Sequence, residues 1–121
     1  MARARDDRQV RGREAEALAA SYLERNGLAI VERNWRCRHG ELDLIARDGD
    51  VLVFVEVRLR RRNDFGGAAA SIDAAKQAKL VAAAGLYLGR FRTPPACRFD
   101  AVLLDALAPA RVQWMRSVIE A

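Results

Sequence analysis

The stretch G-E-L-D-L-I-A-R-D-G-D-V-L-V-F-V-E-V-R, residues 40–58, decides the fold class of this sequence. Two runs, 41–46 within it and 51–59 reaching one residue beyond it, are rich in apolar and β-branched residues, which is typical of β-strands. Between them stands the dipeptide Asp48-Gly49, one of the strongest local signals of a tight hairpin turn. We therefore predict an antiparallel β-hairpin whose two strands are these runs.

The flanking sequence predicts further elements on both sides of the hairpin. Apolar residues recur at the spacing of a helix face before it, and an Ala- and Leu-rich segment of helical character follows it. Three more segments have the composition or the alternation of strands. The expected helices are at 12–26 and 69–89, and the further strands at 28–35, 98–106 and 111–120.

These elements make one mixed α/β domain in the order α-β-β-β-α-β-β. No repeat or long linker divides the chain, and 121 residues suffice for one domain with a real core. Residues 1–10 are strongly charged and offer almost nothing to bury, so we expect a flexible N-terminal arm there. The domain itself is expected to span residues 11–121.

The charge of the chain favours an anionic partner. Lys and Arg number 21 against 16 Asp and Glu, which gives a net charge of +5 and a pI near 10.0. All but Lys76 and Lys79 of these cations are Arg, which binds phosphate in bidentate geometry. A GC-rich genome would also enrich Arg, so the charge by itself leaves nucleic acid, a membrane surface and an acidic protein open.

Cysteine use and the N-terminal sequence predict a cytoplasmic protein. Cys37 and Cys97 are far apart and form no CxxC pair, which is typical of reduced thiols in a cytosolic chain. The first twenty residues lack the uninterrupted apolar core of a signal peptide. No stretch approaches the roughly 18 apolar residues of a membrane span, so we expect no membrane association.

The expected hairpin gathers carboxylates on one face of the sheet. With the Asp-Gly dipeptide at the centre of the turn, Asp43 faces Phe54 and Glu41 faces Glu56 across the two strands. Asp43 and Glu56 are then diagonal neighbours on that face, with Cβ atoms roughly 7–8 Å apart. Carboxylates held this close repel one another, and a cation between them would relieve the repulsion.

This face has two interpretations. Mg²⁺ prefers one or two carboxylates with water and phosphate, so Asp43 and Glu56 are candidate ligands for Mg²⁺ or Mn²⁺ at a phosphodiester. Arg58 follows Glu56 by two residues and would direct its guanidinium to the same phosphate. The alternative is a solvated face whose acids are neutralised by neighbouring arginines.

The residues 40–58 resemble the signature of the YraN family of bacterial proteins, usually written GEIDLIARDG…LVFVEVK. The likeness continues through 12–23, 34–36, 65–67, Lys76-Gln77 and 98–100, and so covers nearly the whole chain. That family is similar to archaeal Holliday-junction resolvases and to the wider restriction-endonuclease-like fold. The resemblance implies that fold here, with a mixed central β-sheet flanked by helices.

The resemblance also implies a set of site residues. Asp43 would match the metal-binding Asp of the hairpin, and Glu56 the acidic residue of the D…ExK motif. Glu16 would match the helix Glu that completes the metal site, although the helical pattern does not distinguish it from Glu14. Gln77 would match a helix residue that lines the site. Arg58 stands where the motif has Lys, and because Arg keeps its proton it would act by charge alone.

The leading hypothesis is therefore a Mg²⁺-dependent, endonuclease-like protein that acts on branched or otherwise structured DNA. The basic segment Arg60, Arg61 and Arg62, followed by a Gly-containing loop, would track the phosphate backbone, joined by Lys76 and Lys79. A homodimer is expected by analogy with the resolvases. Two alternatives are a binding module of the same fold without turnover and an interaction protein whose basic face meets an acidic partner.

Overall fold

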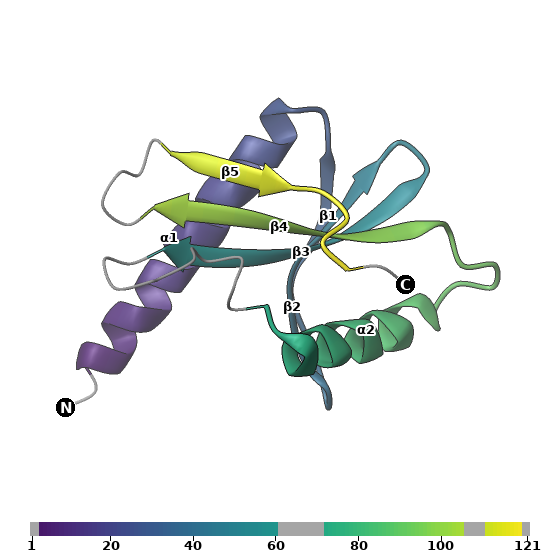
Figure 1. Ribbon diagram of the computed structural model, residues 1–121, viewed down its shortest axis with the longest axis horizontal. Coiled ribbons are helices and arrows are strands. Elements are labelled where there is room, and N and C mark those ends of the chain that lie inside the picture. The colour runs from purple at the N-terminus through teal and green to yellow at the C-terminus, as the bar shows by residue number, and fades with distance from the viewer. Residues whose placement is uncertain (1–2, 61–71, 106–110, 120–121) are drawn as a thin grey trace.

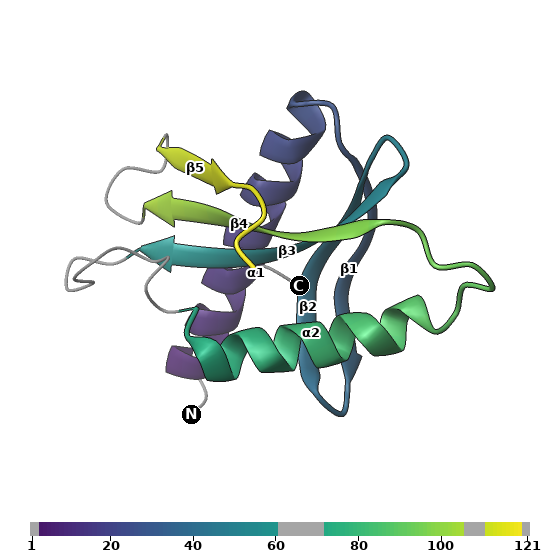
Figure 2. The same cartoon turned by 45° about the vertical axis from the view of Figure 1, so that its right-hand side comes forward.

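A five-stranded mixed sheet with one helix on each face forms the fold (Figures 1 and 2). The computed structural model describes residues 3–60, 72–105 and 111–119, and only the backbone of residues 3–11 and 60. In chain order the elements are α1 (Arg3–Arg25), β1 (Ala29–Cys37), β2 (Gly40–Asp48), β3 (Val51–Arg60), α2 (Ala74–Leu88), β4 (Cys97–Asp105) and β5 (Val112–Met115). The predicted order and the α/β class are confirmed.

The strands lie in the order β1-β2-β3-β4-β5, which follows the sequence. Neighbouring strands are antiparallel except β3 and β4, which are parallel and pair residue by residue from Leu52 with Cys97 to Arg60 with Asp105. A parallel pair needs a crossover connection, and α2 supplies it. The helix that follows β3 therefore passes over the sheet and brings its first turn close to that strand's end.

Two apolar layers hold the helices to the sheet, and small residues let both helices approach it closely. On one face α1 contributes Ala15, Ala19, Ala20 and Leu23, packed on the valines of β3. On the other face α2 contributes Leu80, Ala83, Ala84 and Tyr87, packed on Ile45, Leu52, Phe54 and Phe99. The central strands are thus buried on both faces, which explains why β3 is a continuous apolar run.

The hairpin between β2 and β3 forms as predicted, but its register differs from the expected one by two residues. The turn residues are Gly49 and Asp50, so Asp48 pairs with Val51 and Ile45, in place of Asp43, pairs with Phe54. Gly49 has φ 61°, a conformation that glycine adopts without steric cost. A shift of two residues keeps each paired side chain on its face, and the pairing runs from Asp48 with Val51 to Leu44 with Val55.

The bounds of the first helix and of the last strand also differ from the predicted ones. α1 begins at Arg3, within the segment 1–10 that the sequence predicts as a flexible arm, and the flexibility of that arm stays a prediction. Ala, Arg and Gln are good helix formers, and two aspartates near the N-terminus favour the helix dipole. The expected strand at 111–120 is only Val112–Met115, and Ser117 follows with φ 54°. Within the residues described, neither helix is long and apolar enough to cross a membrane.

Candidate metal centre

Three carboxylates meet where α1 passes over the β1–β2 end of the sheet. Glu16 comes from α1, and Glu41 and Asp43 from β2. One oxygen of each lies within 4.8 Å of one oxygen of each of the others, and all three side chains are half-buried. The separation is short enough for a single cation to contact all three groups.

A backbone irregularity in β1 shapes this cluster. Asn34 has φ 53°, a left-handed conformation that Asn tolerates better than most residues. On the neighbouring strand Leu42 packs toward α2 whereas Leu44 packs toward α1, so the regular alternation of faces breaks at Asp43, between them. The positive φ of Asn34 on β1 and the break at Asp43 on β2 thus both lie in the part of the sheet that carries the cluster.

Asn34 also bridges two of the acids. With its amide nitrogen facing the carboxylates, it donates to Glu41 Oε1 at 2.6 Å and to Glu16 Oε2 at 2.8 Å. The opposite orientation of the amide would face oxygen with oxygen, so the hydrogen-bond network fixes the assignment. A neutral amide positions the two carboxylates but leaves their negative charges uncompensated.

The fourth acid, Glu56 on β3, is hydrogen-bonded to Asp43 through its side chain. Asp43 Oδ2 also accepts a hydrogen bond from the Val57 backbone N–H at 2.9 Å. Burial, together with the hydrogen bond and the charge of Glu56, raises the pKa of Asp43 to about 9. At neutral pH the ion-free protein therefore keeps a proton between these two carboxylates, which removes their mutual repulsion.

The pKa of Glu16 is also raised, first by burial and then by the negative charge of Glu41. The Asn34 hydrogen bond and Arg13 oppose this rise. Both raised pKa values indicate that the site holds more negative charge than its surroundings stabilise. A cation that replaces the protons would therefore stabilise the folded protein.

Glu56 differs from the other three acids because two cations reach it. Its side chain is 4% exposed, and its Oε2 lies 3.2 Å from Arg58 Nη2 and 3.1 Å from Lys76 Nζ. Lys76 comes from the first turn of α2, where the Asp73 side chain accepts a hydrogen bond from its backbone N–H. Within the Asp43–Glu56 pair, Asp43 therefore lies among further acids, whereas Glu56 lies among cations.

A cavity of about 370 Å³ opens beside the carboxylate cluster and is lined by Gly12, Arg13, Glu16, Asn34, Arg36 and Glu41. Arg36 Nε contacts Glu41 Oε2 at 3.1 Å, and its side chain is 79% exposed. The acids form one part of the cavity wall and two arginines another. This arrangement fits a ligand that brings both a divalent cation and a phosphate.

The donor set fits a hard cation. The grouped residues offer carboxylate oxygens alone, with neither His nor Cys among them. Mg²⁺ and Mn²⁺ prefer oxygen ligands and keep several waters when bound by a few carboxylates, which suits an open cavity. Glu16, Glu41 and Asp43 are the residues that would hold such an ion.

Comparison with known proteins identifies the family. The model described as "Uncharacterised protein family UPF0102" matches residues 15–104, which include all four acids of the site. The chain belongs to the UPF0102 family. This is the YraN family that the sequence motifs predicted, so the predicted membership is confirmed.

Relatives match over nearly the full UPF0102 chain. It is 48% identical over 118 residues to the UPF0102 protein HEAR0176 of Herminiimonas arsenicoxydans, covering 98% of this chain and 93% of that protein. A UPF0102 protein of Dechloromonas aromatica strain RCB is 52% identical over 120 residues, covering 98% and 96%. One of Stutzerimonas stutzeri strain A1501 is 51% identical over 116 residues, covering 93% and 96%. These names state the family and no reaction.

The UPF0102 fold brings several of the predicted site residues together. Glu16, Asp43 and Glu56 all lie at the cluster, whereas Glu14 is exposed. Sequence reasoning named Glu41 as a neighbour but did not assign it as a ligand. Its position two residues before Asp43 on one strand was the available signal, because residues i and i+2 of a regular strand lie on the same face.

The predicted nucleic-acid contacts divide into three groups. Lys76 lies at Glu56, and Lys79, one turn along α2, is exposed. Gln77 donates through Nε2 to the Ile72 carbonyl oxygen at 3.2 Å, so its side chain amide stabilises the start of the helix. Arg60 ends β3, and its side chain lies outside the described residues, as do Arg61 and Arg62.

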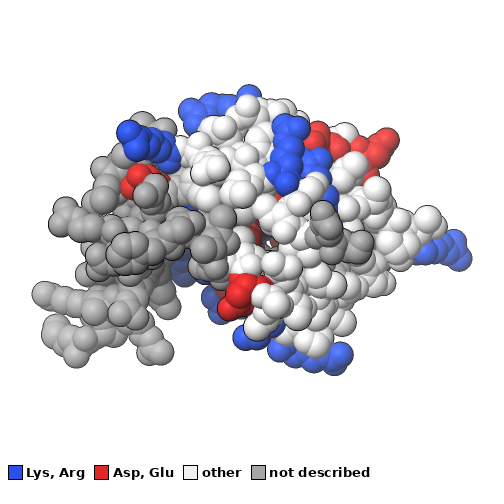
Figure 3. Space-filling view, viewed as in Figure 1, with Lys and Arg blue, Asp and Glu red and all other residues white. Residues whose placement is uncertain are grey.

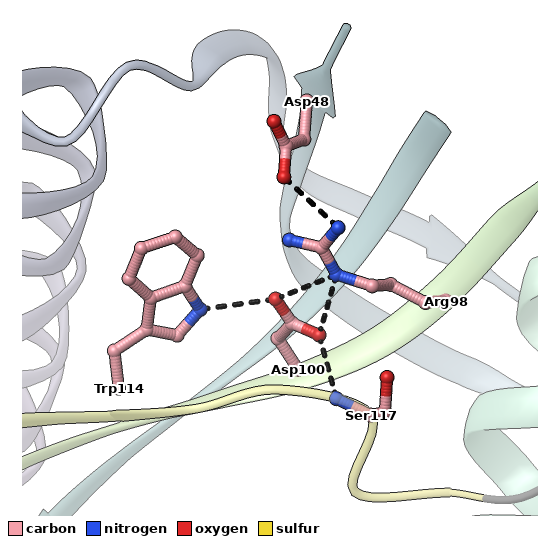
Figure 4. A network of polar contacts seen from close by, with 5 residues as sticks. All are labelled: Asp48, Arg98, Asp100, Trp114 and Ser117. Carbon is pink, nitrogen blue, oxygen red and sulfur yellow. Dashed lines mark hydrogen bonds and ion pairs between the residues drawn. The ribbon is translucent and has the colours of Figure 1, made fainter. Parts of the chain in front are cut away.

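A second buried polar network is centred on β4 (Figure 4). Asp100 on β4, 1% exposed, accepts hydrogen bonds from Arg98 Nε, from Trp114 Nε1 at 3.0 Å and from the Ser117 backbone N–H at 3.0 Å. Arg98 Nη1 also contacts Asp48 Oδ2 at 2.9 Å. The network ties the hairpin end of β2, β4 and the C-terminal segment together.

Proposed function

We propose that this UPF0102 protein is a Mg²⁺- or Mn²⁺-dependent endonuclease of the restriction-endonuclease-like fold, acting in the cytoplasm on structured or branched DNA. One observation carries the proposal: carboxylate oxygens of Glu16, Glu41 and Asp43 lie within 4.8 Å of one another. The cluster adjoins a cavity that is lined in part by arginines. It also adjoins Glu56, a carboxylate in contact with the ammonium of Lys76. A phosphodiester at this place would meet both a metal ion and positive side chains.

Each residue of the site would have a separate role in the reaction. A bound Mg²⁺ or Mn²⁺ would polarise the phosphodiester and lower the pKa of an attacking water. Glu16, Glu41 and Asp43 would hold that ion, and Asp43 would release its proton when the ion binds. Before the ion binds, Glu56 fixes the Asp43 carboxyl through the hydrogen bond that this proton makes. Arg58 would stabilise negative charge near Glu56.

The cationic groups around the site would bind the DNA backbone. Arg13 and Arg36 line the cavity itself. Figure 3 shows the Lys and Arg side chains of one face in separate groups rather than in a single broad patch. Discrete groups suit contacts with individual phosphates, and we keep the 60–62 segment and Lys79 as further proposed contacts. A homodimer would present two such sites to a two-fold symmetric junction.

The test is cleavage of a labelled four-way DNA junction in Mg²⁺ and in Mn²⁺. We expect nicking that stops in EDTA and falls by about 100-fold or more in Asp43→Asn and Glu16→Gln, since the ion then loses a charged ligand. Glu14→Gln is the matched control, because Glu14 lies on the same helix but is exposed. Equal activity of the two Glu variants would contradict the assignment of Glu16.

A binding module without turnover is the second candidate. The observation in its favour is that Glu56 already has two cationic partners and stands beside Arg58 instead of a motif Lys. Tight, salt-sensitive DNA binding without cleavage in either metal would establish this function. Absence of binding to any DNA or RNA at about 50 mM salt, where phosphate contacts are strong, would instead favour an acidic protein partner.

A further inference from the structure

Two cations converge on one oxygen of a single buried carboxylate. Arg58 Nη2 lies 3.2 Å and Lys76 Nζ 3.1 Å from Glu56 Oε2, and the Glu56 side chain is 4% exposed. A buried carboxylate needs one positive charge to be neutral, and leaving it unpaired would be costly. Two cations exceed that need by one charge. The second cation is therefore available for another anion.

The two cations differ in the geometry of their donors rather than in exposure. Arg58 lies on the strand beside Glu56, and its Nε is buried without a hydrogen-bond partner among the described residues. Its side chain as a whole is 30% exposed, and its donors are fixed in one plane. Lys76 carries three rotatable N–H donors, and its side chain is 34% exposed. Its ammonium can keep its contact with Glu56 and still direct a donor toward a solute.

The location of Lys76 follows from the crossover. The Asp73 cap and the first turn of α2 place it at Glu56, which in turn is hydrogen-bonded to Asp43. Lys76 therefore contacts one carboxylate of the Asp43–Glu56 pair, and the other carboxylate, Asp43, groups with Glu16 and Glu41. An anion that spans this pair would contact a metal ion at one end and this ammonium at the other.

We propose that Lys76 is a catalytic residue that binds a non-bridging oxygen of the scissile phosphate, while Arg58 neutralises Glu56. This inference rests on the nuclease function proposed above and deepens it. Lys76 acts in this step as a hydrogen-bond donor. A water oxygen forms the new bond to phosphorus while the bond between phosphorus and the ester oxygen breaks. The attacking water loses one proton to solvent, and the leaving ester oxygen takes one proton from solvent. The compact ammonium stabilises the negative charge that develops on the phosphate.

The two lysines of α2 give a matched pair for the test. Lys76→Met and Lys79→Met each remove one charge from the same helix, and only Lys76 contacts a carboxylate of the site. We measure the affinity for a labelled four-way junction in Ca²⁺ against salt concentration, and the single-turnover cleavage rate in Mg²⁺ at saturating DNA. Lys76→Met should lower the rate by about 100-fold and the salt slope by about 0.9.

Lys79→Met should lower the cleavage rate far less, by no more than about 3-fold, as expected for one exposed charge. Lys76→Arg keeps a cation at Glu56 and so preserves the fold, but its planar fork should not replace a compact ammonium at the phosphate. We expect affinity within about 3-fold of the native protein and a rate at least about 10-fold lower. Thermal unfolding of each variant checks that the comparison is made on folded protein.

The outcomes distinguish the proposed role of Lys76 from the proposed nuclease function. If the native protein cleaves, but both Met variants bind and cleave alike, Lys76 only neutralises Glu56 and the inference is wrong. If the native protein fails to cleave, yet Lys76→Met alone loses affinity and salt dependence, the phosphate contact stands and the nuclease function is wrong. If Lys76→Met leaves DNA binding unchanged in a protein that does not cleave, both are wrong.

Discussion

Asp100 and Glu56 are both buried acids on neighbouring strands, but their surroundings differ in kind. Asp100 receives N–H donors from Arg98, Trp114 and the Ser117 backbone, which together satisfy both oxygens (Figure 4). Glu56 meets a second carboxyl and two cations, beside a cluster of further acids. The first arrangement stabilises one rigid structure. The second concentrates charge that a bound ion and a phosphate would complete, which is typical of functional sites.

The largest effect on stability is expected at Asp100. Asp100→Ala leaves the Arg98 guanidinium, the Trp114 indole N–H and the Ser117 backbone N–H without their shared acceptor. We expect a loss of about 3–5 kcal/mol in the free energy of unfolding, measured with a denaturant. Asp48→Asn, at the 39% exposed end of the same network, should cost no more than about 1 kcal/mol. Equal losses would show that the network is not centred on Asp100.

The next largest effect is expected in how the free energy of unfolding changes with pH, which should depend on Asp43 and not on Asp100. Because the pKa of Asp43 is raised to about 9 in the fold, the native state binds a proton that the unfolded state releases above its ordinary pKa near 4. This contribution is complete below that ordinary pKa and is lost as the pH rises toward 9. In EDTA, unfolding free energy should fall by up to about 1.4 kcal/mol per pH unit between pH 5 and 8.

Asp43→Asn is the control for that titration. The amide cannot titrate, so the slope over the same pH range should become markedly smaller in this variant. Asp100→Asn should keep the slope of the native protein, whatever it does to absolute stability. A native protein whose unfolding free energy does not change from pH 5 to 8 would contradict the burial of a protonated Asp43.

Divalent ions should stabilise the metal centre by a smaller amount. Mn²⁺ at 100 times its dissociation constant stabilises the folded state by about 2.7 kcal/mol if it binds only that state. We expect a corresponding rise in the melting temperature at pH 8 that is lost in Glu16→Gln and kept in Glu14→Gln. A rise of equal size in both variants would place the ion elsewhere.

The smallest effect is expected at the rim of the cavity. Arg36 is 79% exposed and contacts Glu41, so Arg36→Ala should change the unfolding free energy by no more than about 0.5 kcal/mol. The same change removes a positive charge that competes with the ion for Glu41. Calorimetric titration should therefore give tighter Mn²⁺ binding in Arg36→Ala, and weaker binding would contradict Glu41 as a ligand.

The register of the hairpin shows where local sequence stops being sufficient. The chain reads Asp-Gly-Asp at 48–50, which allows either Asp48-Gly49 or Gly49-Asp50 at the centre of a two-residue turn. Both choices keep the same faces, so the strand pattern does not distinguish them. In the observed register Phe54 packs against the rings of Tyr87 on α2 and Phe99 on β4. These contacts join distant parts of the chain, so a local pattern does not predict them.

The sequence by itself determined the element order, the hairpin, the family and the set of acids that includes Asp43 and Glu56, because strand periodicity and motif spacing are local properties. Only the tertiary structure decided that Glu41 joins Glu16 in the cluster, that Lys76 reaches Glu56 from a crossover helix, and that Asp100 is fully satisfied from the C-terminal segment. These contacts join residues far apart in the chain or depend on a backbone distortion in a neighbouring strand. They follow from packing two helices on a twisted sheet, which no local pattern encodes.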